Sequence, residues 1–237
     1  MAYLEPQDGI RLAWRVRPVR PSGVKSDETF ADFGAKTSTY ASHDVIYYEG
    51  DSARRLFEVA SGTVMLFKLL PDGRRQVVEV LRQGEIFGLA GSDEYDCTAE
   101  TLTEATVHEL ELRLVEASAE VQCKLAKCLS NQMRILHEHA VLLGRKSAVE
   151  RVASFLMYLV PDRGGLGCVG PDDEANDGYD LKLHMTRQEI ADYLGLTIET
   201  VSRVVSDLKR RGVIRIDRSD QIHLKRVCSL CQMTGMH

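Results

Sequence analysis

The chain has 237 residues, of which 44% are hydrophobic and 27% charged, and its formal net charge is −5. This composition is ordinary for a globular protein with one large or two modest domains. No apolar run approaches the roughly 18 residues that span a bilayer, and the acidic start at residues 1–6 is unlike a secretory signal. We therefore expect a cytoplasmic protein that has no membrane partner and whose six cysteines are free thiols.

The N-terminal half of the chain begins with an irregular segment and continues as a series of short strands. Residues 1–27 contain several arginines and prolines without a clear period, which indicates an N-terminal arm. Over residues 28–118, strand-like runs alternate with turn signals such as Pro71-Asp72-Gly73. The expected strands are 45–48, 56–60, 63–70, 76–81 and 106–110. Their regular spacing predicts a small antiparallel β-roll, within a protein of the α+β class.

Residues 119–146 carry the pattern of one long helix. Apolar residues recur there at spacings of three and four, close to a heptad seam. The residues of this stripe are Leu125, Leu129, Met133, Leu136, Ala140 and Leu143. The stripe is typical either of a helix packed on its own domain or of a helix paired with its copy in a homodimer. Its place between a roll and the motif described next favours a dimerisation helix.

The C-terminal region, residues 147–237, contains two adjacent capped helices. Thr186 and Glu189 have the spacing of a capping box at the start of the first helix. Gly195 suits the left-handed conformation that ends a helix, and Thr197 is a good cap for the next one. Two helices joined by so short a bend are typical of a helix-turn-helix, whose second helix enters the major groove of DNA.

The second of these helices has a buried face and a polar face. The residues spaced for burial are Ile198, Val201, Val205 and Leu208. The polar face carries Glu199, Ser202 and Arg203 in its first turns. Arg can donate two bonds to guanine, Glu can accept from cytosine, and Ser can bond a base or a phosphate. The residues placed for backbone phosphates are Thr186, Thr197, Ser206, Lys209 and Arg211. A charged face alone is often only solvated, but the caps, the bend and the polar triplet together predict sequence-specific binding to double-stranded DNA.

A hairpin and a local charge excess support this prediction. Residues 213–217 and 221–225 read as two strands around a turn, which indicates a winged helix-turn-helix. Between residues 186 and 226 there are nine Lys and Arg against six Asp and Glu, although the whole chain is acidic. The sequence thus predicts a basic DNA-binding region within an otherwise acidic protein.

The string from Met185 to Arg203 resembles the DNA reader of the cyclic-AMP receptor and fumarate-nitrate regulator (CRP/FNR) superfamily, specifically its FixK and FNR branches. Those branches use the pattern Glu-x-x-Ser-Arg. Residues 50–51 and 84–88 are similar to turns of the family's roll. The resemblance covers nearly the whole chain after the arm. It implies a cyclic-nucleotide-binding-like β-roll, a dimerisation helix, a winged helix-turn-helix, and a homodimer on palindromic sites with TTGAT-like half-sites.

The resemblance also implies a role and a further partner. The loop containing Asp72 and Gly73 is similar to the turn that contacts RNA polymerase in this family. FixK members are mainly activators downstream of an oxygen-sensing two-component system. They control genes of low-oxygen respiration and nitrogen fixation.

Two ligand sites of the superfamily are missing from this sequence. Cyclic-AMP-binding members carry a Glu for the ribose and later an Arg-Ser pair for the phosphate, where this chain has Leu89 and Tyr95-Asp96. An anion in place of a cation disfavours phosphate, so we expect no cyclic nucleotide. The iron–sulfur cluster of the FNR branch is held largely by N-terminal cysteines, and the first cysteine here is Cys97. We therefore expect no cofactor.

Other interpretations stay open. Cys228 and Cys231 have the spacing of metal ligands, but a complete site usually needs four, so we expect no metal. A haem-based gas sensor in the roll is an alternative. Its candidate imidazoles are His43, His108, His137 and His139. An enzyme or a non-DNA interaction module is the alternative of another class, which the sequence disfavours because it shows no nucleophile–base pair, phosphate loop or metal motif.

Overall fold

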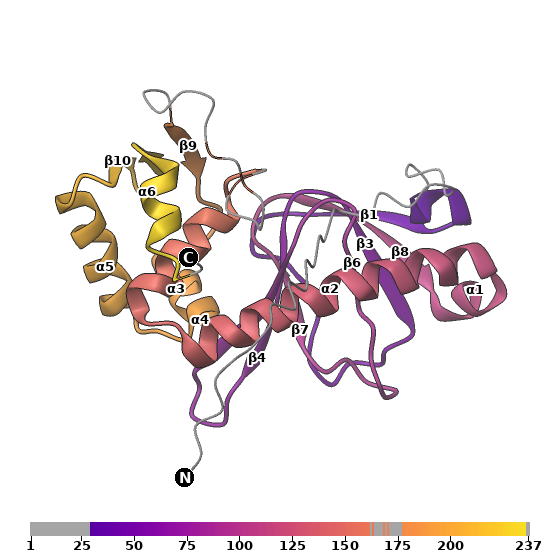
Figure 1. Ribbon diagram of the computed structural model, residues 1–237. Coiled ribbons are helices and arrows are strands. Elements are labelled where there is room, and N and C mark those ends of the chain that lie inside the picture. The colour runs from indigo at the N-terminus through magenta and orange to yellow at the C-terminus, as the bar shows by residue number, and fades with distance from the viewer. Residues whose placement is uncertain (1–28, 162, 164–167, 169, 171–176, 236–237) are drawn as a thin grey trace, which may run out of the picture.

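The computed structural model describes residues 29–161, 163, 168, 170 and 177–235. The expected N-terminal arm, residues 1–27, lies outside the described residues, as does His237. A long helix runs beside a β-roll at one end and leads into a mainly helical C-terminal domain at the other (Figure 1). Within the described residues, no helix combines the length and apolar character needed to cross a membrane.

The roll consists of two four-stranded antiparallel sheets, with strand orders β1-β8-β3-β6 and β2-β7-β4-β5. Its strands are β1 (Lys36–Tyr40), β2 (Val45–Tyr47), β3 (Arg55–Ser61), β4 (Val64–Leu69), β5 (Arg75–Leu81), β6 (Ile86–Phe87), β7 (Thr98–Thr101) and β8 (Ala105–Glu111). A 3-10 turn, η1 (Phe30–Phe33), precedes them and a short helix, α1 (Leu112–Ala117), follows. The predicted antiparallel roll is confirmed, and the two sheets enclose a core between them.

Aromatic rings fill the interior of the roll. The ring of Tyr95 stacks on that of Tyr47 at a centroid distance of 3.8 Å, and Phe57 stacks on Phe87 at 5.1 Å. The hydroxyl of Tyr95 donates to the carbonyl of Arg55 across 2.9 Å. Gly88 has a φ of +83°, and a Cβ there would lie 2.7 Å from the ring of Phe57, so the backbone approaches this cluster too closely for a side chain.

The long helix α2 (Ala119–Arg145) has two apolar faces. One face packs against other parts of the same chain, and Val121, His139 and Leu142 are buried there. At the two ends of the predicted stripe, Leu125 and Leu143 are partly buried against clusters of their own chain. Between them Met133, Leu136 and Ala140 are exposed, and Leu129 is half-buried. The stripe therefore splits into ends that pack within the chain and a middle that does not.

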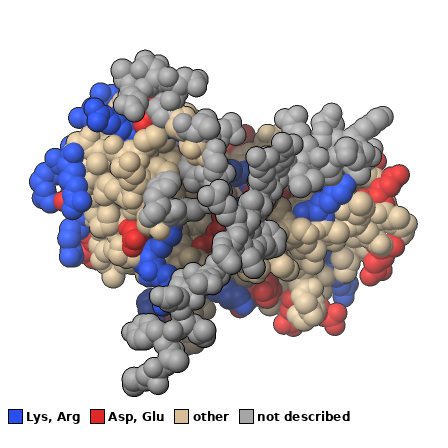
Figure 2. Space-filling model, in the orientation of Figure 1, with Lys and Arg blue, Asp and Glu red and all other residues tan. Residues whose placement is uncertain are grey.

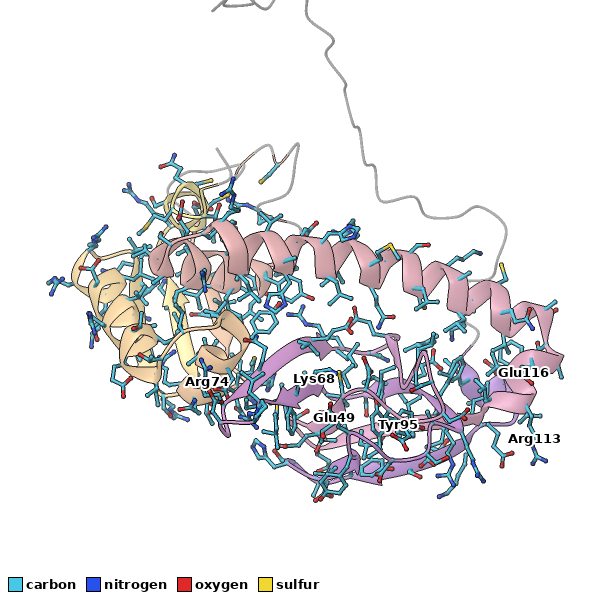
Figure 3. The ribbon with its side chains drawn as sticks, turned by 90° about the horizontal axis from the view of Figure 1, so that it is seen from below. Glu49, Lys68, Arg74, Tyr95, Arg113 and Glu116 are labelled. Carbon is cyan, nitrogen blue, oxygen red and sulfur yellow. The ribbon has the colours of Figure 1, made fainter. Side chains whose placement is uncertain are left out.

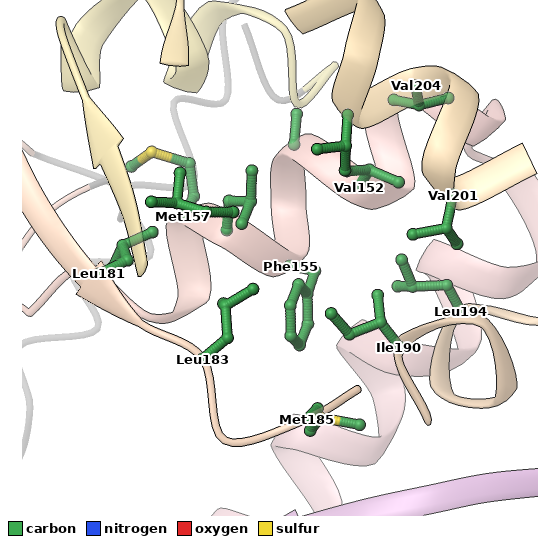
Figure 4. Packing of buried hydrophobic residues seen from close by; sticks show 14 of the residues in the cluster. Val152, Phe155, Met157, Leu181, Leu183, Met185, Ile190, Leu194, Val201 and Val204 are labelled. Atoms are coloured by element: carbon green, nitrogen blue, oxygen red, sulfur yellow. The ribbon is translucent and has the colours of Figure 1, made fainter. Parts of the chain in front are cut away.

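The C-terminal domain is a small helical core closed by a three-stranded sheet of order β10-β11-β9. Its elements are α3 (Ala148–Tyr158), β9 (Tyr179–Lys182), α4 (Arg187–Leu194), α5 (Ile198–Arg210), β10 (Ile214–Arg218), β11 (Gln221–Leu224) and α6 (Val227–Gln232). Phe155 of α3 lies at the centre of this core, among Leu183, Ile190 and Met185 (Figure 4). The predicted wing corresponds to β10 and β11, which pair antiparallel.

Candidate nucleic-acid interface

The start of helix α4 is fixed by a reciprocal cap. The hydroxyl of Thr186 accepts from the backbone N–H of Glu189 across 3.2 Å, and the N–H of Thr186 donates to Oε2 of Glu189 across 2.6 Å. Gly195 ends the helix with φ +59°. Thr197 then caps α5 by accepting from the N–H of Thr200 across 3.2 Å. The predicted capping box, bend and second cap are all present, and they set the angle between the two helices.

The inner face of α5 differs from the prediction at one position. Val201, Val205 and Leu208 are buried as expected, but Ile198 is 37% exposed and Val204 is buried instead. Ile198 stands in the first turn, beyond the edge of the core, whereas Val204 lies between Val201 and Leu208 on the packed side. The prediction for Ile198 was therefore wrong, and the buried face begins one turn later.

Glu199, Ser202 and Arg203 lie together on the exposed side of α5. The pKa of the Glu199 carboxyl is lowered, first by its own backbone N–H and by the hydroxyl of Thr197, and then by the charge of Arg203. Glu199 is thus an anion that accepts hydrogen bonds at neutral pH. Among the described residues, no carboxylate comes within ion-pair distance of Arg203. Its guanidinium donors are therefore available to a ligand.

The proposed phosphate-contacting residues differ in how they are engaged. Lys209 is exposed and makes no ion pair within the described part of the chain. Arg211 is held by Asp207, with Nε 2.7 Å from Oδ2, and Arg210 bonds the same carboxylate. Ser206 donates its hydroxyl to the carbonyl of Ser202 across 2.8 Å. Thr186 and Thr197 are exposed, but their hydroxyls already serve as caps.

Basic side chains gather where α5 meets solvent. Figure 2 shows Lys and Arg along the outer edge of the C-terminal domain, over α5 and the strands beside it. The exposed basic residues of α5, its C-terminal end and β10 are Arg203, Lys209, Arg210, Arg211, Arg215 and Arg218. Such a local excess of positive charge attracts the phosphate backbone of DNA, although the chain as a whole is acidic.

The sequence did not reveal that the roll docks directly on the helix-turn-helix. Nε of Arg75 in β5 lies 2.8 Å from Oδ2 of Asp192 in α4. The ring of His139 in α2 stacks on Tyr193 at 4.3 Å and its Nε2 is 2.9 Å from the Tyr193 carbonyl. Burial lowers the pKa of His139, so the ring is neutral at neutral pH. One hydrophobic cluster also joins the two domains, through Met65 of the roll among others.

The β4–β5 hairpin reaches toward the C-terminal domain, with Arg74 at its tip (Figure 3). Asp72 accepts from the backbone N–H of Arg74 across 3.1 Å and from its Nε across 2.7 Å. Both hydrogen bonds lower the pKa of the Asp72 carboxyl. Asp72 and Gly73 therefore form a small, exposed, structured turn.

One of the two cysteines near the C-terminus, Cys228, lies beside a guanidinium. Arg163 donates to Sγ of Cys228 across 3.2 Å and to Oδ1 of Asp177 across 2.6 Å. Cys231 is buried on the inner face of α6, and burial raises the pKa of its thiol. Cys228 and Cys231 therefore stand in different surroundings despite their close spacing in sequence.

Comparison with known proteins agrees with this architecture. A model of the Crp-like helix-turn-helix domain matches residues 150–233, and a model of the cyclic nucleotide-binding domain matches residues 37–120. The chain is 41% identical to the nitrogen fixation regulation protein FixK of Rhizobium meliloti (strain 1021), over 76% of this chain and 78% of that protein. It is 33% identical to a protein of the same name from Azorhizobium caulinodans, over 94% and 89%. The solved structure of FixK2 from Bradyrhizobium japonicum aligns with a TM-score of 0.72 and 31% identity, over 86% of this chain and 98% of that one.

Proposed function

This chain belongs to the CRP/FNR superfamily of transcription regulators, in its FixK-like branch, and we propose that two copies of it together read a palindromic DNA site. Its relatives are DNA-binding transcription regulators and not enzymes. We also propose the sequence of the half-site, the residues that bind it, the dimer interface and the class of genes controlled.

Helix α5 carries the proposal, because its exposed side presents Glu199, Ser202 and Arg203 with no intramolecular ion pair to Arg203 among the described residues. A TTGAT half-site offers guanine O6 and N7 to Arg203 and, on the complementary strand, the cytosine amino group to Glu199. Ser202 can bond a neighbouring base or phosphate. Each well-placed pair contributes about 1–3 kcal/mol of discrimination against the wrong base. Thr186, Thr197, Ser206, Lys209 and Arg211 surround the reading face as the proposed phosphate contacts.

The middle of α2 supports the homodimer. Met133 is 58% exposed and Leu136 is 43% exposed, and both lie on one face with Ala140. Figure 3 shows that α2 lies along one side of the roll and the C-terminal domain, so its outer face meets neither. Large exposed apolar residues at heptad spacing are typical of a helix pair. We propose that the copies pair through Leu129, Met133, Leu136 and Ala140, with Leu125 and Leu143 at the margins.

We propose that DNA binding does not require cyclic nucleotide. Tyr95 and Tyr47 occupy the interior of the roll with their stacked rings. Asp96 adds an anion next to Tyr95, where the nucleotide-binding relatives place a cation for the phosphate. A carboxylate at this position would repel the phosphate of a bound nucleotide.

The biological role is proposed from the relatives. Two of them are named for regulation of nitrogen fixation, and another, from Cereibacter sphaeroides, is the transcriptional activator protein FnrL. We propose that this chain activates genes of nitrogen fixation or low-oxygen respiration, with Asp72 and Gly73 in the turn that meets RNA polymerase.

The haem alternative has less support in the geometry. The ring of His139 is buried against Tyr193, and His108 lies 3.0 Å from the hydroxyl of Thr37 on the outside of the sheet. His43 lies 3.1 Å from Glu100. These imidazoles are engaged at separate places rather than around one apolar cavity.

Selection of bound duplexes from random DNA tests the proposal. We expect recovered sites to be two-fold symmetric with TTGAT-like half-sites, without any added nucleotide. Recovery of unrelated or asymmetric sequences would contradict it.

A further inference from the structure

Three side chains with metal-binding atoms meet at the junction between the roll and helix α4. They are His43 in the turn before β2, Glu100 in β7 and Glu189 in α4, and their ligand atoms all lie within 4.8 Å of one another. Nδ1 of His43 is 3.1 Å from Oε1 of Glu100 and 3.7 Å from Oε1 of Glu189. The three residues come from three separate elements and two domains.

The backbone holds His43 in an unusual conformation that turns it toward this cluster. Its φ is 66°, which makes it the one non-glycine residue with positive φ in the described chain. Its N–H donates to the carbonyl of Thr101 across 2.8 Å, and the backbone N–H of Asp44 donates to the hydroxyl of the same threonine across 3.0 Å. The turn is thereby fixed to β7, one residue away from Glu100.

The two distances from His43 are close to the separation of neighbouring ligands in a coordination shell. Two ligands about 2.0–2.1 Å from a tetrahedral zinc ion lie about 3.4 Å apart, close to both His43 distances. Oε2 of Glu189 accepts a hydrogen bond from the N–H of Thr186, and Oε1 faces His43. In Glu100, Oε1 faces His43, while Oε2 lies 4.0 Å from Arg75.

The surrounding charge is unbalanced. Glu100, Glu189 and Asp192 bring three carboxylates to this junction, and Arg75 supplies the guanidinium that lies between two of them. The side chains of Glu100 and Glu189 are only 15% and 5% exposed, so water screens their repulsion weakly. A divalent cation would neutralise the remaining negative charge, and the half-exposed His43 ring leaves it a route of entry.

We propose that His43, Glu100 and Glu189 bind a divalent transition-metal ion that clamps the roll to the helix-turn-helix. Imidazole and carboxylate ligands together suit ions such as Zn²⁺, Fe²⁺ and Mn²⁺. Glu189 also closes the cap of α4, so the ion would fix the first turn of that helix against β7. The site would couple metal supply to the placement of the DNA-reading helix.

Titration of the purified full-length protein with Zn²⁺ and Co²⁺ tests the proposal. We expect about one equivalent per chain, and visible Co²⁺ bands without the intense near-ultraviolet bands of a thiolate ligand. His43→Asn keeps the backbone, because Asn tolerates positive φ, and it should weaken binding about tenfold or more, as should Glu100→Gln. His108→Asn, a histidine on the outside of β8, should leave the affinity unchanged.

Thermal unfolding tests separately whether the bound ion holds the two domains together. An ion that binds only the docked arrangement raises the Tm, so Zn²⁺ should raise the Tm of the wild type and of His108→Asn but not of His43→Asn. Absence of binding, equal affinity in all variants, or thiolate bands that vanish in Cys228→Ser would overturn the site. Tight binding at His43 without a rise in Tm would overturn the clamp.

Discussion

Nε of Arg75 in the roll lies 2.8 Å from Oδ2 of Asp192 in the first helix of the helix-turn-helix, and both side chains are largely shielded from solvent. The residues are 117 positions apart, so the contact exists only when the two domains dock. Through this pair the position of β5 constrains the position of α4, and α4 in turn carries α5. The roll therefore constrains the position of the helix-turn-helix by direct contact as well as through α2.

A double-mutant cycle should detect this coupling. Arg75→Ala and Asp192→Ala should each lower the free energy of unfolding, and the double variant should lose less than the sum by about 1–2 kcal/mol. Urea unfolding of the wild type, the two single variants and the double variant measures this coupling free energy. Strict additivity would mean that the ion pair does not couple the domains.

The exposed middle of α2 predicts the oligomeric state. Leu136→Glu places a charge in the proposed seam, so it should convert the dimer to a folded monomer, as seen by analytical ultracentrifugation and circular dichroism. Tyr48→Glu is the control, because Tyr48 is 60% exposed and belongs to the turn that follows β2 rather than to α2. A Leu136→Glu protein that still sediments as a dimer would refute this interface.

Lys209 should contribute affinity without specificity. Its exposed ammonium makes no ion pair within the described residues, so it is available to a phosphate. Lys209→Ala should weaken specific and non-specific binding alike. It should also reduce the slope of log K against log salt concentration by about one unit for each subunit in contact. Lys36→Ala, at the start of β1, should change neither. An unchanged slope in Lys209→Ala would remove this residue from the contact surface.

Stability should depend on pH through Glu79. Burial, with a smaller contribution from Glu85, raises the pKa of Glu79 from 4.5 to about 7. The folded chain holds this proton more tightly than the unfolded chain, so stability falls as pH rises from about 4.5 toward 7. Glu79→Gln should therefore gain up to roughly 3 kcal/mol at about pH 8 and nothing at about pH 4. Glu104→Gln, on an exposed loop, is the control for chemical denaturation at both pH values. An equal gain in stability for Glu79→Gln at both pH values would contradict a raised pKa for Glu79.

The sequence predicted the elements whose signals are local. The caps at Thr186 and Thr197 and the bend at Gly195 involve neighbours in the chain, and all three are present. The strands β1 and β7 were missed because Lys36–Tyr40 and Thr98–Thr101 are mostly polar and owe their strand conformation to partners distant in sequence.

The junction was not predictable for the same reason. His139 belongs to the helix pattern and gives no sign that its ring stacks on Tyr193, 54 residues later. His43, Glu100 and Glu189 likewise meet only after the roll and the helix-turn-helix have docked. Ile198 was misassigned because helical period alone does not tell where the core ends.

The most direct test of the reading helix is the affinity of Arg203→Ala for a TTGAT-type palindrome at matched salt. With one Arg203 in each half-site, we expect specific binding to fall at least about thirtyfold, to the level of a scrambled duplex, while circular dichroism stays unchanged. Arg210→Ala, whose side chain bonds Asp207, should keep the preference for the palindrome. If Arg203→Ala binds the palindrome as tightly as the wild type does, α5 does not read DNA through this residue and the account is contradicted.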